Sequence, residues 1–127
     1  MSTFRNLKIW QKAITLVTKI YQETKGFPQE EIYGLTSQIK RASISIPSNI
    51  AEGYGREGKN DYLKFLNIAM SSLFELQTQL EIGKNLNFIS ENNFIAIYED
   101  TRELERMLSS FIKTIKTSKQ TTNSATQ

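Results

Sequence analysis

The stretch from Gln38 to Arg56 has helical periodicity, a proline inside it and glycines at its end. Apolar residues in and just before it recur at helical spacing and fall on one face. They are Leu35, Ile39, Ala42, Ile46 and Ile50. Four polar residues fall in a single stripe on the opposite side. They are Arg41, Ser45, Ser48 and Glu52. The stretch is therefore predicted to form a helix with a core face and an ordered polar face, cationic at one end and anionic at the other.

Three other stretches show helical periodicity, and no convincing strand pattern of period two interrupts them. The expected helices span about 6–24, 27–55, 60–83 and 90–116, with Asn6 and Ser90 as N-caps. Short turns between consecutive helices favour antiparallel neighbours. The sequence thus predicts an all-α, up-and-down antiparallel four-helix bundle over residues 1–116, followed by a disordered polar tail over 117–127.

Pro47 lies well inside the second of these helices. Its ring removes the hydrogen bond to the Ser43 carbonyl, so we expect a bend there. Asn49, beside the proline, can satisfy carbonyls freed by the missing N–H, and a binding role is the alternative. Gly53 is expected to permit close packing or to end the helix.

The predicted first helix carries two adjacent apolar seams. One contains Leu7, Trp10, Ile14, Val17 and Tyr21. The other contains Ile9, Ala13, Leu16 and Ile20. A helix that packs only within a monomer usually needs one such stripe. The second seam indicates either a surface buried against another subunit or a helix lying in the cleft between two neighbours of its own bundle.

The composition argues against several classes of function. The chain has no cysteine and no histidine, which removes thiolate ligands, thiol nucleophiles and the commonest general base. We therefore expect no metal, no cofactor and no enzymatic activity. No apolar run approaches the ~20 residues of a membrane span, and the first residues lack a signal-peptide pattern. These features indicate a cytoplasmic protein without membrane contact. The net charge of +3 permits contact with a polyanion but is modest for a nucleic-acid-binding arm.

Positions that match a known family are spread over most of the chain. They are Leu7, Trp10, Ala13, Phe27-Pro28, Tyr33-Gly34-Leu35, Gln38, Arg41-Ala42, Ser45-Ile46, Asn49-Ile50-Ala51-Glu52-Gly53, Arg56, Tyr62, Phe65-Leu66, Ala69, Ser72-Leu73 and Glu75-Leu76. On these residues, and above all on the run SIPSNIAEG, the chain resembles the four-helix-bundle family encoded in intervening sequences of bacterial 23S rRNA genes. The resemblance covers roughly residues 4–112 and departs at Ser71, where such proteins often carry glycine.

The resemblance implies a left-handed four-helix bundle that assembles into a ring, expected to be a homopentamer. It implies no established enzymatic activity. Accessory proteins of diversity-generating retroelements look similar in fold and bind a reverse transcriptase and nucleic acid, although they are as a rule more basic. The implied partners are further copies of the chain and RNA or a nucleic-acid-processing protein.

Two groups of basic residues are candidates for contact with nucleic acid. A stripe on the predicted first helix, opposite Trp10, contains Lys8, Lys12 and Lys19, with Arg5 alongside. A ring would multiply this weak patch through avidity, whereas the other interpretation is ordinary solvated surface. Arg56 and Lys59 lie in the loop after the second helix. The run from Gly53 to Lys59 fits G-x-x-x-x-G-K, but a helix rather than a strand precedes it, so no P-loop is expected.

The polar stripe of the second helix is interpreted as structural. Arg41 and Glu52 lie about three turns apart, too far to pair within a straight helix, so each is expected to contact another helix or subunit. A ligand or nucleic-acid contact by Arg41, or a solvated face, are the alternatives. On the predicted fourth helix, the carboxylates Glu99, Asp100, Glu103 and Glu105 lie among two arginines at spacings that suit surface ion pairs.

These features predict a non-catalytic, oligomeric assembly or adaptor protein that contacts RNA or a ribonucleoprotein. The alternative is a purely structural homo-oligomer with a protein partner and no nucleic-acid contact.

Overall fold

The computed structural model describes residues 2–118, and within that range the only regular elements are helices. The α-helices are α1 (Lys8–Thr24), α2 (Leu35–Tyr54), α3 (Lys59–Asn85) and α4 (Glu91–Thr117). Short 3-10 helices, η1 (Phe4–Asn6) and η2 (Gln29–Glu31), precede α1 and α2. The predicted all-α bundle is confirmed. Residues 119–127 of the predicted polar tail lie outside the described residues.

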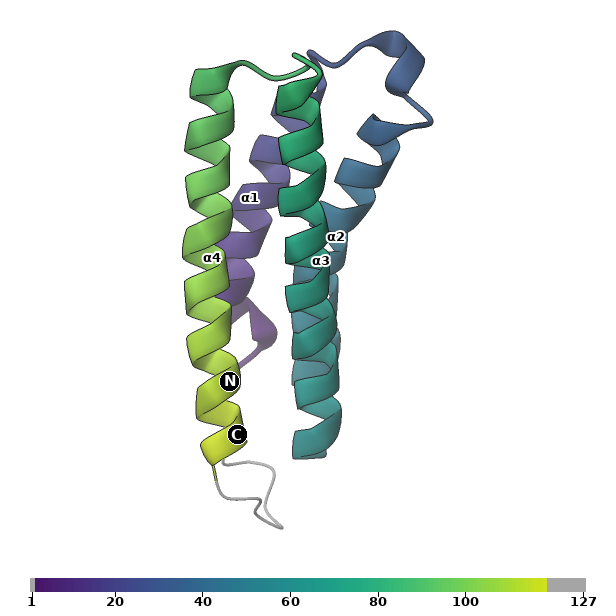
Figure 1. Ribbon diagram of the computed structural model, residues 1–127. Helices are drawn as coiled ribbons and strands as arrows, with labels where there is room; N and C mark the ends of the chain where they lie inside the picture. Colours follow the sequence, from purple (N-terminus) through teal and green to yellow (C-terminus); the bar gives the residue numbers. More distant parts are fainter. Residues whose placement is uncertain (1, 119–127) are drawn as a thin grey trace.

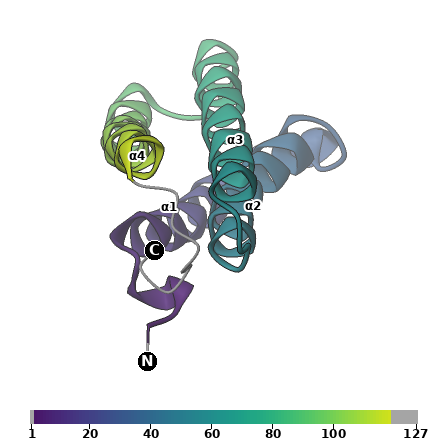
Figure 2. The same ribbon diagram turned by 90° about the horizontal axis from the view of Figure 1, so that it is seen from below.

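Successive helices run in alternating directions along the bundle (Figure 1). α2 packs against α1 and α3, and α4 packs against the same two helices. The start of α1, the end of α2, the start of α3 and the end of α4 therefore share the lower end in Figure 1. Figure 2 shows the bundle from that end.

The starts of α1 and α2 differ from the predictions. Asn6 does not cap α1, which begins at Lys8; its Oδ1 instead accepts a hydrogen bond from the Thr3 N–H at 3.0 Å and caps η1. The second α-helix does not begin near Pro28, because the chain there forms only the turn η2 before Gly34 interrupts the helical backbone. At the fourth helix, Ser90 is the N-cap as predicted, and its Oγ accepts from the Asn93 N–H at 3.2 Å.

The core is built from one face of each α-helix. The largest side chains that are fully buried are aliphatic, apart from one threonine. They are Leu16, Ile20, Ile39, Ile46, Ile50, Leu66, Leu73, Leu76, Leu80, Thr101, Leu104 and Leu108. Full burial of one such aliphatic side chain contributes ~1.5–3 kcal/mol relative to exposure. The apolar face predicted for the 38–56 stretch is therefore the face on which α2 enters the core.

α2 and α3 approach closely at the end of α2. A Cβ added to Gly53 would lie 2.8 Å from Phe65 Cβ and 3.1 Å from Tyr62 Cδ1. Atoms so near the α3 backbone have little room to move. Glycine at this position therefore permits the close packing of the two helices, one of the two roles that the sequence suggests for it.

Candidate functional site

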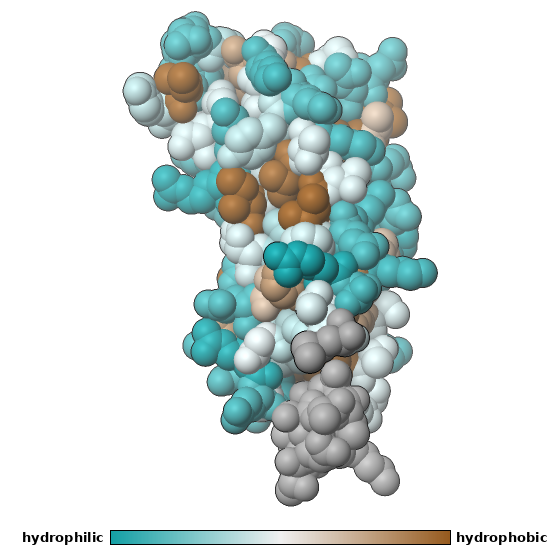
Figure 3. Space-filling view, turned by 180° about the vertical axis from the view of Figure 1, so that it is seen from behind, coloured by the Kyte–Doolittle hydropathy of each residue, from teal (hydrophilic) through white to brown (hydrophobic). Residues whose placement is uncertain are grey.

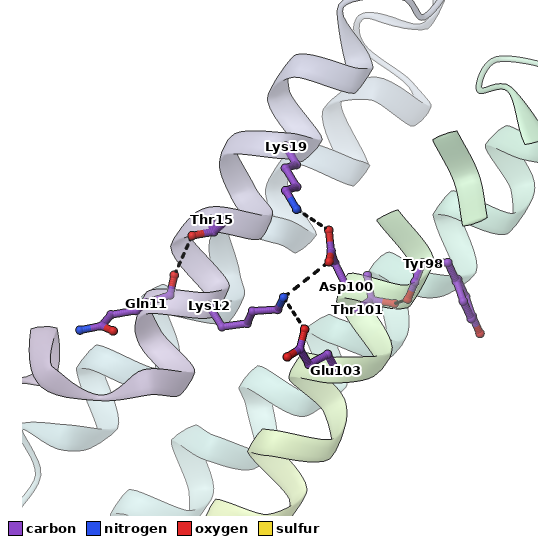
Figure 4. Close-up of polar contacts among 8 residues, drawn as sticks. All are labelled: Gln11, Lys12, Thr15, Lys19, Tyr98, Asp100, Thr101 and Glu103. Atoms are coloured by element: carbon purple, nitrogen blue, oxygen red, sulfur yellow. Dashed lines mark hydrogen bonds and ion pairs between the residues drawn. The ribbon is translucent and has the colours of Figure 1, made fainter. Parts of the chain in front are cut away.

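Charged side chains connect α1 to α4 (Figure 4). Lys12 Nζ lies 2.6 Å from Glu103 Oε1 and 3.5 Å from Asp100 Oδ1, and Lys19 Nζ lies 2.7 Å from Asp100 Oδ2. The hydrogen bond that Lys12 donates to Glu103 raises the pKa of Lys12, with Coulombic attraction from both carboxylates added and partial desolvation opposing it. The side chains of Lys12 and Asp100 are each 21% exposed. This arrangement holds the two helices in register.

The predicted basic stripe is therefore divided by the fold. Lys12 and Lys19 face carboxylates of the same chain, which neutralise them. Arg5 and Lys8 stay exposed, with the Arg5 guanidinium 4.7 Å from the Phe4 ring centroid. Only the N-terminal part of the stripe thus keeps a cationic surface available for a polyanion.

The two basic residues after α2 also have partners within the chain. Arg56 Nη2 lies 3.5 Å from Glu52 Oε1, and its guanidinium lies over the Phe65 ring at 4.7 Å from the centroid. Lys59 Nζ donates to the Ser118 carbonyl at 2.6 Å and so connects the start of α3 to the end of α4. Both cations help to close this end of the bundle.

The polar stripe of α2 does not act as one surface. Ser45 is half-buried and its Oγ shares a hydrogen bond with Ser72 Oγ of α3 at 2.8 Å. Asn49 Nδ2 donates to the Ser45 carbonyl at 2.8 Å and to Ser45 Oγ at 3.0 Å. The carbonyl that Asn49 satisfies is thus that of Ser45, not the Ser43 carbonyl that Pro47 leaves without its amide donor. This trio joins α2 to α3.

The other three residues of the same stripe lie on the outside of the bundle. Arg41 and Ser48 are exposed, and Arg41 has no ion pair with a described residue. Glu52 pairs with Arg56 one turn further on rather than with Arg41. Arg41 therefore projects from α2 without a charged partner in the described chain.

The two apolar seams of α1 differ in burial. Ile9, Ala13, Leu16 and Ile20 are buried in the core. On the other seam Ile14 is 39% exposed and Tyr21 36%, while Ile44 of α2 is 42% exposed. Lys40 Nζ of α2 lies 4.9 Å from the Tyr21 ring centroid, which places the second seam beside α2. On the face of the molecule opposite to the view of Figure 1, hydrophobic side chains gather near the middle (Figure 3).

A polar network between α3 and α4 was not predicted from the sequence. Gln77 Nε2 donates to Thr101 Oγ1 at 3.2 Å and to Glu105 Oε1 at 3.0 Å, while Thr101 Oγ1 donates to the Tyr98 carbonyl at 2.6 Å. Arg102 adds an ion pair with Glu105 at 3.6 Å. A glutamine beside an apolar face gave no signal of this role, because its partners lie on a helix distant in sequence.

The acidic residues of α4 form no metal site. Within residues 2–118 no group of three or more carboxylates is arranged to hold a metal ion. No helix in the same range is long and apolar enough to cross a membrane.

Comparison with known proteins places the chain in a family. Residues 5–110 match the model of the family described as 23S rRNA-intervening sequence protein. A solved structure of a protein of unknown function from the S23 ribosomal protein family of Bacteroides thetaiotaomicron is similar, with 25% identity and a TM-score of 0.77. The similarity covers 83% of this chain and 98% of that one. A comparison with curated proteins found no match.

Proposed function

Because the chain belongs to the 23S rRNA-intervening sequence protein family, we propose that it is a non-catalytic helical-bundle protein that assembles with copies of itself and contacts RNA or a ribonucleoprotein in the bacterial cytoplasm. The assembly is proposed to be a ring, with five copies as the expected number. The family's description refers to 23S rRNA, and the chain carries a net positive charge of +3. Both features favour a partner that carries phosphate groups.

The exposed seam on α1 is the observation that supports self-assembly. Ile14 and Tyr21 of α1 and Ile44 of α2 are exposed apolar side chains, the half-buried Trp10 and Val17 belong to the same seam of α1, and the contact of Lys40 with Tyr21 places α2 beside that seam. Removal of such surface from water contributes ~25 cal/mol per Å². Stable interfaces have an apolar centre of this kind surrounded by polar residues. A second copy of the chain, seated on this surface, would explain why α1 has two seams.

The assembly is tested by light scattering on a size-fractionated sample. We expect a mass several times that of one chain for the wild type, and a mass near one chain for the double variant Ile14→Gln, Ile44→Gln. The matched control is Ile95→Gln, since Ile95 is also exposed but lies on α4. A monomeric wild type, or equal masses for the two variants, would contradict self-assembly through this surface.

RNA contact is tested by titration with a structured RNA at low and near-physiological salt. Binding that weakens steeply with salt supports phosphate contacts, since each contact releases condensed counterions. A second candidate function is a structural homo-oligomer whose partner is a protein. The neutralisation of Lys12 and Lys19 by carboxylates of the same chain favours it. Absence of RNA binding even at low salt would establish this second candidate over the first.

A further inference from the structure

Positive charge is concentrated in the C-terminal half of α4. From Arg106 to the end of the helix at Thr117 there are three cations, Arg106, Lys113 and Lys116, and no carboxylate. All three cations are exposed, and none of them has an ion pair among the described residues. The positive ends of these side chains are therefore open to a partner.

The carboxylates of α4 that could neutralise this segment have other partners. Asp100 and Glu103 bind Lys12 and Lys19 of α1. Glu105 accepts from Gln77 and pairs with Arg102. The ion pairs with α1 thus remove Lys12 and Lys19 from the set of available cations. Because Asp100 and Glu103 are paired with α1, they do not neutralise the cations in the last turns of α4, which form a basic surface.

The side chains on this segment share one face. Arg106, Ser109, Ser110 and Lys113 recur at helical spacing and, with Glu105, line a shallow depression on the surface. Two cations thus flank two hydroxyls, all of which donate hydrogen bonds. Phosphate oxygens accept bonds from such donors, and the bonds are strong because they are charge-assisted.

A further exposed cation, Lys64 of α3, does not belong to this face. Its Nζ lies 6.0 Å from the centroid of the Phe65 ring, over which the Arg56 guanidinium also lies. Because Phe65 packs at Gly53 near the end of α2, Lys64 lies toward α2 rather than toward α4.

The length of the surface suits a nucleic-acid strand. At 1.5 Å per residue, Arg106 and Lys116 are ~15 Å apart along α4. A nucleic-acid strand carries one phosphate charge per ~3.4 Å of helix axis, so about four phosphates fall within that span. The rings of Tyr62 and Phe111 pack against each other in the bundle, so they do not offer stacking surfaces for bases. We therefore expect this surface to contact the phosphate backbone of the nucleic acid rather than its bases.

We propose that the outer face of the C-terminal half of α4 contacts the phosphate backbone of nucleic acid. The proposal rests on the RNA contact proposed above. It places that contact on Arg106, Lys113 and Lys116 instead of Lys12 and Lys19.

The test compares two triple variants of the full chain in titrations with a structured RNA from low to near-physiological salt. The first variant is Arg106→Gln, Lys113→Gln, Lys116→Gln. The control, Lys25→Gln, Lys64→Gln, Lys84→Gln, removes the same charge elsewhere. For the first variant we expect Kd to rise by at least about tenfold at low salt, and the slope of log K against log salt to become shallower by about 2–3. For the control we expect a change within about twofold, and for both a native circular dichroism spectrum and wild-type mass.

Each other outcome overturns the proposal in a distinct way. If RNA binds the wild type and the first variant equally, the site is elsewhere, and the proposed RNA contact survives. If both variants lose affinity equally, net charge alone determines binding. If polyglutamate of similar length competes as well as RNA, the surface serves an acidic polypeptide. If the wild type itself does not bind RNA at low salt, both this site and the proposed RNA contact fail.

Discussion

At the residue scale, Tyr62 is a polar group in apolar surroundings. It is 4% exposed, its ring packs against Tyr54 and Phe111, and its hydroxyl has no hydrogen-bond partner among the described residues. Burial, with a smaller Coulombic contribution from Tyr54, raises the pKa of this hydroxyl well above its ordinary value. Because the pKa is higher in the folded chain, ionisation of Tyr62 favours the unfolded chain. The free energy of unfolding is therefore unaffected by this group below the unfolded pKa of ~10 and falls as the pH rises above that value.

We therefore predict that Tyr62→Phe changes the pH dependence more than the stability itself. Removal of a buried hydroxyl without a partner should leave the free energy of unfolding at pH 7 unchanged or raise it by ~1 kcal/mol. The loss of stability between about pH 9.5 and 11 should become shallower, because the unfolded chain has one ionising group fewer. Urea unfolding at both ends of this range measures the effect, with Tyr33→Phe as control because Tyr33 is 94% exposed. A loss of stability at neutral pH would show that the hydroxyl has a partner.

At the scale of whole helices, the pairing of α1 with α4 depends on Asp100, which binds both Lys12 and Lys19. We predict that Asp100→Asn lowers the free energy of unfolding by ~1 kcal/mol, since the two ion pairs are partly exposed and screened. The loss should shrink as salt is added. The control is Glu99→Gln, an exposed neighbour with no ion pair among the described residues, which should change the stability by less than ~0.5 kcal/mol. Equal effects of the two substitutions would show that the ion pairs do not support the pairing.

The helices themselves were predictable from the sequence, whereas their polar contacts were not. Helical spacing of Ile39, Ile46 and Ile50 identifies a core face because one face of a bundle helix must be apolar. The same spacing does not reveal that Lys12 meets Asp100, because that contact joins residues far apart in sequence. Gly34 defines the start of α2 through its backbone conformation, which apolar spacing does not encode.

At the scale of the whole molecule, Arg41 lies beside the apolar surface of α1 and α2. It is exposed, lies one turn from Ile44 and has no ion pair among the described residues, while Glu52 is paired with Arg56. If a second copy covers the Ile14–Ile44 surface, Arg41 lies at the rim of that interface, where a carboxylate of the neighbour can meet it. The Arg41 side chain should then contribute to the free energy of assembly and not to the folding free energy of the single chain.

We therefore predict that Arg41→Ala raises the concentration at which the assembly dissociates by about tenfold, equivalent to ~1.4 kcal/mol per contact. The denaturant unfolding of the dissociated chain should stay within ~0.5 kcal/mol of wild type, as expected for an exposed surface position. Light scattering across a dilution series measures the first quantity. Arg102→Ala provides the control, because this arginine is equally a cation on an outer helix surface but pairs with Glu105 within its own helix. An Arg41→Ala assembly that dissociates at the wild-type concentration would place the interface away from this face of α2.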